Sequence, residues 1–105
     1  MRIRFRDLVV GVGMATALAT AAAQAEAPPS ADKGRQLYGS YCARCHGINM
    51  VTPGSGFFDL RTLTAAEQER FEHAVKQGVR AMPAWGSILK PADVQSLWLY
   101  VMAGR

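Results

Sequence analysis

Apolar positions along the chain predict three helices separated by polar loops. Leu37, Tyr41 and Cys45 lie four residues apart, which places them on one face of a first helix. Two later segments repeat the helical spacing, with members Phe71, Ala74 and Val75 in the middle of the chain and Val94, Leu97, Trp98, Val101 and Met102 near its end. No segment alternates apolar and polar residues as a half-buried strand does. The pattern therefore predicts an all-α fold.

Residues that favour helix ends flank these segments. Ser30 is placed to cap the first helix, and Thr64-Ala65-Ala66-Glu67 is a capping box that opens the middle one. Gly78 is predicted to end the middle helix, and Pro91 suits the first position of the last. Residues 47–56 are rich in Gly, Pro, Thr, Asn and Ser, which predicts a loop.

Gly34 leaves two alternatives open. The absence of a side chain can allow another helix to approach closely, and a crossing with the last helix near Trp98 or Tyr100 is one such arrangement. Gly34 can equally be an ordinary exposed glycine. The sequence does not choose between them.

The first 25 residues have the organisation of a secretory signal peptide. Arg2, Arg4 and Arg6 precede an uncharged run at 8–20, and Ala23-Gln24-Ala25 is an A-x-A cleavage signal. The run is shorter than the about 20 apolar residues that span a bilayer. We therefore expect export to the periplasm without stable membrane insertion, and cleavage to a single domain of residues 26–105.

Charge and size narrow the class of protein further. The chain carries a formal charge of +4, but the leader contributes three arginines and one aspartate, which leaves nine basic and seven acidic residues in 26–105, or +2. A net charge this small argues against a nucleic-acid partner. A domain this small buries only about 60% of the surface of its unfolded chain, so we expect a cofactor or another staple to complete its core.

The only two cysteines of the chain lie in Cys42-Ala43-Arg44-Cys45-His46, a C-x-x-C-H motif. This spacing is typical of covalent haem attachment, with two thioether bonds and the histidine as an iron ligand. A thioredoxin-like pair or a disulfide would need a neighbouring strand–helix crossover, and a structural zinc site would need about four ligands, with His73 far from the first three. The motif predicts one covalent haem c, bound through Cys42, Cys45 and His46.

The order of motif and helices carries a family resemblance. A first helix leading into the motif, a loop, a middle helix, the pair Met82-Pro83, and a last helix bearing Leu97-Trp98-Leu99-Tyr100-Val101 resemble class I cytochrome c. The resemblance implies three main helices wrapped around one covalently bound haem. It also implies that Met82 is the second ligand of the iron.

Other residues are weaker candidates for that second ligand. Met50 follows His46 too closely to reach the opposite haem face, and Met102 falls on the core stripe of the last helix. His73 lies on a polar stretch and is expected at the surface. Met82 is therefore the residue predicted to ligate the iron together with His46.

Three further contacts are suggested for the haem and its histidine. In the family, the carbonyl of a proline after the motif accepts a hydrogen bond from the axial histidine, and Pro53 is the corresponding candidate here. Arg61 and Trp85 can each donate to the haem propionates. The alternative for Arg61 is a solvated side chain, and the alternative for Trp85 is a place in the core.

A narrower resemblance concerns partners. Asp59-Leu60-Arg61, Arg70-Phe71 and Met82-Pro83-Ala84-Trp85 resemble the small bacterial cytochromes that serve periplasmic quinoprotein alcohol dehydrogenases. It implies such a dehydrogenase as the electron donor and an oxidase or another cytochrome as the acceptor. We expect an electron carrier and not an enzyme, because the sequence shows no nucleophile with a base and no paired carboxylates, and about 80 residues leave no room for a substrate pocket beside the haem. We also expect a monomer. Two alternatives stay open: a haem sensor or ligand-binding module with an exchangeable sixth ligand, and a peroxidase-like enzyme.

Overall fold

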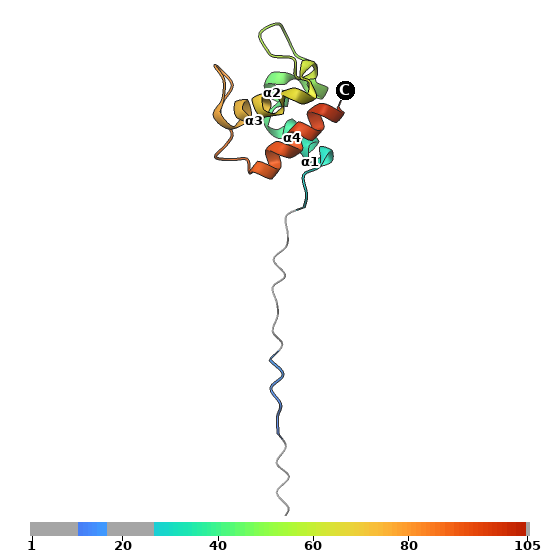
Figure 1. Cartoon of the computed structure of the whole chain (residues 1–105), viewed down its shortest axis with the longest axis vertical. Coiled ribbons are helices and arrows are strands. Elements are labelled where there is room, and N and C mark those ends of the chain that lie inside the picture. The colour runs from blue at the N-terminus through green and yellow to red at the C-terminus, as the bar shows by residue number, and fades with distance from the viewer. Residues whose placement is uncertain (1–10, 17–26, 105) are drawn as a thin grey trace, which may run out of the picture.

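The computed structural model describes residues 11–16 and 27–104, and the elements in these ranges are helical (Figure 1). The α-helices are α1 (Ala31–Tyr41), α2 (Ala43–His46), α3 (Gln68–Gln77) and α4 (Pro91–Ala103), with 3-10 turns η1 (Ile48–Met50), η2 (Leu60–Thr62) and η3 (Ala65–Glu67) between them. Within the described ranges there is no strand, only an isolated bridge between Val79 and Met82, so the predicted all-α fold is confirmed. None of the helices described is long and apolar enough to cross a membrane. The predicted signal peptide lies outside the described residues except for 11–16, which form neither helix nor strand.

The predicted helix ends are confirmed. The side chain of Ser30 accepts a first-turn N–H of α1. Thr64 and Glu67 form the capping box, in which the Thr64 N–H donates to the Glu67 carboxylate at 2.7 Å; the chain turns through η3 before α3 begins. Gly78 ends α3 with a φ of 79°, and Pro91 occupies the first turn of α4.

Helices α1 and α4 cross at Gly34, where their backbones meet. A Cβ placed on Gly34 would lie 1.8 Å from the Ser96 carbonyl oxygen and 2.8 Å from the Cβ of Tyr100. Next to the crossing, the buried Ser96 hydroxyl accepts the N–H of Ser30 at 3.1 Å. Close helix approach is therefore the correct alternative for Gly34, and the exposed-glycine alternative is wrong.

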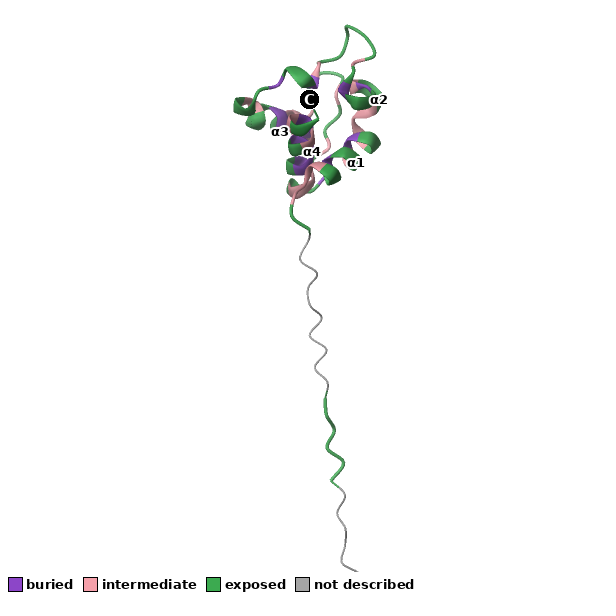
Figure 2. Cartoon of the chain, turned by 90° about the vertical axis from the view of Figure 1, so that its right-hand side faces the viewer, coloured by how far each residue is buried: buried purple, intermediate pink, exposed green. Residues whose placement is uncertain are grey.

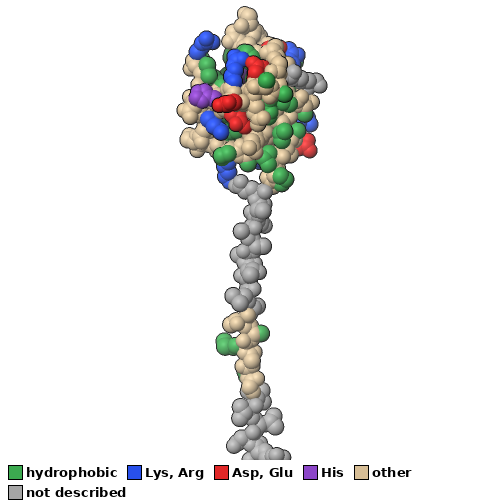
Figure 3. Space-filling model, viewed as in Figure 1, with side chains coloured by type: hydrophobic (Ala, Val, Ile, Leu, Met, Phe, Trp, Pro, Cys, Tyr) green, Lys and Arg blue, Asp and Glu red, His purple; other side chains and the backbone are tan. Residues whose placement is uncertain are grey.

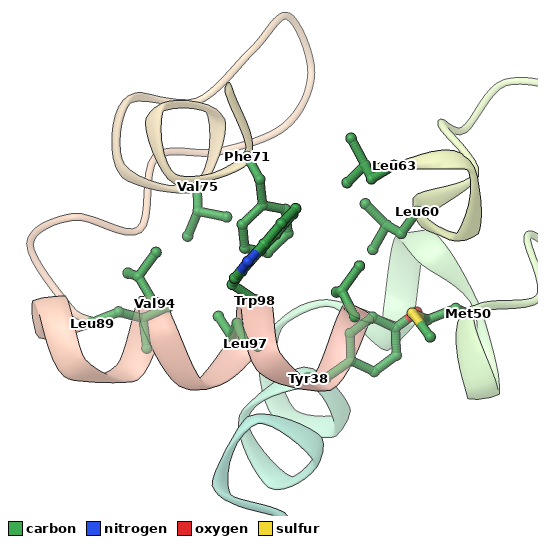
Figure 4. Close-up of a cluster of buried hydrophobic side chains, with 11 residues drawn as sticks. Tyr38, Met50, Leu60, Leu63, Phe71, Val75, Leu89, Val94, Leu97 and Trp98 are labelled. Atoms are coloured by element: carbon green, nitrogen blue, oxygen red, sulfur yellow. The ribbon is translucent and has the colours of Figure 1, made fainter. Parts of the chain in front are cut away.

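The core lies between α4 and the other elements (Figure 4). From α4, Leu97 and Trp98 meet Phe71 and Val75 of α3, with the Phe71 and Trp98 rings 5.3 Å apart. The buried surfaces of the helices face one another, whereas the loop between η1 and η2 is largely exposed (Figure 2). Burying side chains of this size contributes roughly 1.5–3 kcal/mol each, so the apolar stripes read from the sequence hold the helices together.

Candidate haem site

The motif lies on a single helical turn. Cys42 caps the C-terminal end of α1, where its N–H donates to the Tyr38 carbonyl at 2.9 Å, and the His46 N–H then donates to the Cys42 carbonyl at 2.9 Å. Gly47 stops this turn with a φ of 93°, and a Cβ there would collide with the Val51 carbonyl. The buried Tyr38 hydroxyl donates to the Gly47 carbonyl at 2.6 Å, which anchors the turn to α1.

A backbone carbonyl orients the His46 ring. Nδ1 of His46 lies 3.0 Å from the carbonyl oxygen of Phe58. Because a carbonyl can only accept, Nδ1 carries the proton and the lone pair of the ring belongs to Nε2, the nitrogen available to a metal. Such a bond fixes the imidazole and raises its basicity.

The expected role of Pro53 in this contact is therefore wrong. After His46 the chain turns through η1, which places Met50 in the core at 0% exposure, and the carbonyl that meets the histidine belongs to Phe58. Every residue carries a carbonyl, so no side-chain type marks the acceptor in a sequence. Only the path of the loop identifies it.

The two cysteines are free, and their environment does not suit a redox dithiol. Cys42 is half-buried and Cys45 exposed. Burial, with a smaller contribution from Cys45, raises the pKa of the Cys42 thiol to about 12, whereas reactive dithiols have lowered values. Nor do any three His, Cys, Asp or Glu side chains gather as metal ligands in the parts of the chain that the structure describes. The thioredoxin-like and zinc alternatives thus find no support in the described residues.

Met82 lies in a tight turn fastened to the end of α3. Val79 and Met82 exchange N–H···O bonds of 3.1 and 2.9 Å, and the Trp85 N–H donates to the Val75 carbonyl at 2.8 Å. The turn packs so closely on Gly78 that a Cβ there would lie 2.7 Å from the Met82 carbonyl oxygen. These bonds hold the backbone of Met82, while its side chain is half-buried against the core.

An aromatic contact joins the Met82 segment to the motif. The rings of Tyr41, directly before Cys42, and Trp85, three residues after Met82, lie 5.2 Å apart with an edge-to-face angle of 62°. Sequence reasoning missed this pair, since helical spacing carries no information about a partner from a loop. This contact shows that the segment with the motif and the segment with Met82 lie next to each other.

Of the rival ligands, Met102 and His73 occupy the places expected of them, whereas the burial of Met50 in the core was not predicted. Met50 is fully buried, Met102 packs against the core, and His73 is exposed. Arg61 donates to the Asp59 carboxylate through Nε at 3.0 Å and through its terminal nitrogen at 2.9 Å, which lowers the pKa of Asp59. The propionate contacts suggested for Arg61 and Trp85 stay predictions.

The residues present suit a covalent haem. Two free thiols and an imidazole with its Nδ1 bonded to a carbonyl form the donor set of the attachment motif. The segments that carry the motif and Met82 also expose apolar side chains, with Val51 56% exposed and Phe57 and Val79 each 45% exposed, as suits contact with a flat apolar macrocycle. A helical fold with this donor set defines a c-type cytochrome of class I type.

Comparison with known proteins gives the family. Residues 29–101 match the model of the family described as cytochrome c oxidase, cbb3-type, subunit III, and the chain belongs to this family. Cytochrome c6 of Rippkaea orientalis is 31% identical over 77 residues, which cover 70% of this chain and 69% of that protein. The cytochrome c subunit of 4-cresol dehydrogenase [hydroxylating] from Pseudomonas putida is 33% identical over 84 residues, covering 76% of this chain and 66% of the subunit.

A third relative is much longer than this chain. Quinohemoprotein alcohol dehydrogenase ADH IIB of Pseudomonas putida is 39% identical over 80 residues, which cover 73% of this chain and 11% of that protein. The chain thus spans about a tenth of the length of the quinohemoprotein alcohol dehydrogenases it matches. Family and motif together establish the predicted cofactor, covalent haem c, and the general role of electron transfer.

Proposed function

We propose that this protein is a periplasmic carrier of single electrons whose haem iron is ligated by His46 and Met82. The observation that carries the proposal is the bond from His46 Nδ1 to the Phe58 carbonyl, which leaves Nε2 for the iron beside the two thiols of the motif. Cys42 and Cys45 would form the thioethers. The haem, when bound, supplies a one-electron iron couple.

Each ligand has support from its own segment. The Phe58 carbonyl keeps the His46 imidazole in one orientation and raises its basicity. The turn closed by Val79 and Met82 keeps the thioether beside the core. A thioether is a soft, neutral ligand that stabilises reduced iron and raises the potential, which suits a carrier that receives electrons from an enzyme.

The proposed partners are redox proteins that dock transiently. By resemblance, the donor is a quinoprotein alcohol dehydrogenase and the acceptor an oxidase or another cytochrome; the relatives include a quinohemoprotein alcohol dehydrogenase and a dehydrogenase cytochrome subunit. Basic and acidic side chains both lie on the face shown in Figure 3. The proposed contact around the haem edge is small and short-lived, as is typical of redox encounters. In this proposal the protein acts as a monomer and transforms no substrate.

Replacement of Met82 by Ala tests the ligation. In the purified holoprotein, Met82→Ala should abolish the weak long-wavelength band that methionine ligation gives to oxidised class I cytochromes, lower the midpoint potential, and let carbon monoxide bind the reduced form. Met102→Ala removes a methionine that packs against the core and should leave band and potential in place. An unchanged band in Met82→Ala would remove Met82 from the mechanism, and avid carbon monoxide binding by the unaltered protein would favour the sensor alternative.

Localisation and partner are tested separately. Sequencing of the N-terminus of protein recovered from the periplasm should begin at Glu26 if cleavage follows Ala25. Rapid mixing of the oxidised protein with a substrate-reduced quinoprotein alcohol dehydrogenase should reduce the haem within the turnover time of that enzyme. A periplasmic protein that such a dehydrogenase does not reduce would keep the carrier role and exclude this donor.

A further inference from the structure

Phe58 carries the carbonyl that orients His46, yet little in its own chemistry fixes it. A proline would lock its own φ, whereas phenylalanine has no ring that fixes its backbone. Its side chain is 45% exposed, so the core does not enclose it either. The orientation of the histidine therefore depends on whatever holds Phe58 in place.

A residue near the N-terminal end of α3 contacts Phe58 and restrains it. The Arg70 guanidinium carbon lies 5.2 Å from the centre of the Phe58 ring, within the range of a cation–π contact. Arg70 in turn donates to the Glu67 carboxylate at 3.1 Å, and the same carboxylate accepts the Thr64 N–H at 2.7 Å. A continuous set of contacts thus connects the capped start of α3 with the residue whose carbonyl meets His46.

The residue after Phe58 is held as well. Asp59 caps η2 by accepting the Arg61 N–H at 3.0 Å, and its carbonyl accepts the Thr62 hydroxyl at 2.7 Å. These bonds lie within the loop itself. Of the contacts described for Phe58, the one with Arg70 ties the loop to a long helix.

We propose that Arg70 and Glu67 are positioning residues for the axial histidine. Glu67 holds the Arg70 guanidinium over the Phe58 ring, and the ring keeps its carbonyl in line with His46 Nδ1. This inference rests on the proposed ligation of the iron by His46. Neither residue touches the haem in this scheme; both act through Phe58.

Exchange of the His46 Nδ1 proton with solvent measures the contact. In the oxidised holoprotein this proton should give a paramagnetically shifted NMR resonance, and its exchange rate reports how often the bond to Phe58 opens. Arg70→Gln and Glu67→Gln should each speed exchange about two- to fivefold, the factor that an exposed cation–π contact supports. Glutamine at position 67 can still form the capping box, so the helix start is kept.

The two variants separate positioning from simple electrostatics. Arg70→Gln removes a positive charge and Glu67→Gln removes a negative one. A long-range charge effect would therefore shift the exchange rate in opposite directions in the two variants, and likewise the midpoint potential. Positioning moves the exchange rate in the same direction in both. Arg70→Lys, which keeps the cation, should restore most of the slow exchange.

Phe58→Leu completes the design without any change of charge. It removes the ring but keeps the carbonyl, and should speed exchange as Arg70→Gln does; Arg70→Gln added to Phe58→Leu should then have no further effect. Backbone amides in the buried part of α4 serve as the control for global opening, and their exchange should not change.

Three outcomes would overturn the inference. These are unchanged Nδ1 exchange in Arg70→Gln and Glu67→Gln, opposite shifts in exchange in the two variants, or an additive effect of Arg70→Gln in the Phe58→Leu background. Failure of the ligation proposal looks different, because the unaltered protein would then show no shifted Nδ1 resonance from His46 at all.

Discussion

The crossing of α1 and α4 and the loops that bear the site are stabilised in different ways. At the crossing, backbones meet at Gly34, and the ring of the buried Tyr38 lies 5.1 Å from the ring of the half-buried Tyr100. The loops at 51–59 and 79–86 are held by a small number of hydrogen bonds to backbone carbonyls and by partly exposed rings. One region is fixed by dense packing of helix on helix, whereas the other is built to be completed by its cofactor.

The sharpest test of this difference is removal of the haem. Residues 26–105 produced without attachment, or with both Cys42→Ala and Cys45→Ala, should lack a cooperative thermal transition, because a domain this small buries only about 60% of its unfolded surface. Circular dichroism during heating measures the effect. A cooperative transition with native-like helix content in the haem-free chain would show that the region around the crossing of α1 and α4 folds without haem.

The next largest effect is expected at Gly34. Gly34→Ala places a Cβ 1.8 Å from a backbone oxygen that cannot turn away, so the holoprotein should lose about 3 kcal/mol of unfolding free energy, the upper part of the range for overpacking. Denaturant unfolding measures this loss.

Gly39 on the same helix is the matched control. A Cβ there meets nothing within 4 Å, so Gly39→Ala should stabilise α1 by roughly 0.5–1 kcal/mol. Equal effects at the two glycines would mean that the crossing is not the rigid part of the fold.

Predictability from sequence follows the same division. Helix ends and core faces depend on local chemistry, so Ser30, the capping box at Thr64 and the stripe of α4 could be predicted and are confirmed. The C-x-x-C-H motif also predicts covalent haem attachment directly, since few other functions need this spacing. Gly34 could be recognised as special but not assigned, because its partner lies some sixty residues away in α4.

The site loops could not be predicted in the same way. The acceptor for His46 is a backbone carbonyl, and the choice of Phe58 over Pro53 depends on a path that includes the burial of Met50. The pairs Arg70–Phe58 and Tyr41–Trp85 are likewise long-range contacts between a helix and a loop. Patterns of period 3.6 identify the buried face of a helix but say nothing of which loop meets its exposed side.

Tyr38 links the helix crossing to the motif turn at Gly47 and gives a pH-dependent prediction. Burial is the largest cause that raises the pKa of its phenol to about 12 from an ordinary value of 10, and the nearby Tyr100 adds to it. The folded state thus favours the neutral phenol, so the stability it contributes is present below pH 10 and lost as pH rises towards 12.

Replacement of that hydroxyl checks both effects. Tyr38→Phe keeps the ring but removes the donor to the Gly47 carbonyl, which should cost about 1 kcal/mol at neutral pH. The fall in unfolding free energy between pH 10 and 12 should then be shallower than in the unaltered holoprotein. An identical alkaline profile would assign that loss of stability to other groups.

An effect of similar size, and the most specific to the site, is expected from the contact of Tyr41 with Trp85. Edge-to-face pairs contribute about 0.5–1.5 kcal/mol beyond area burial, so Tyr41→Leu, Trp85→Leu and the double variant should give a coupling energy in that range. Because the pair joins the end of α1, directly before the motif, to the Met82 turn, each single variant should also lose the methionine-ligation band at a lower denaturant concentration than it loses its helices. Additive losses of unfolding free energy, or a band that disappears only with the helices, would mean that the Met82 segment is held by its bonds to α3 alone.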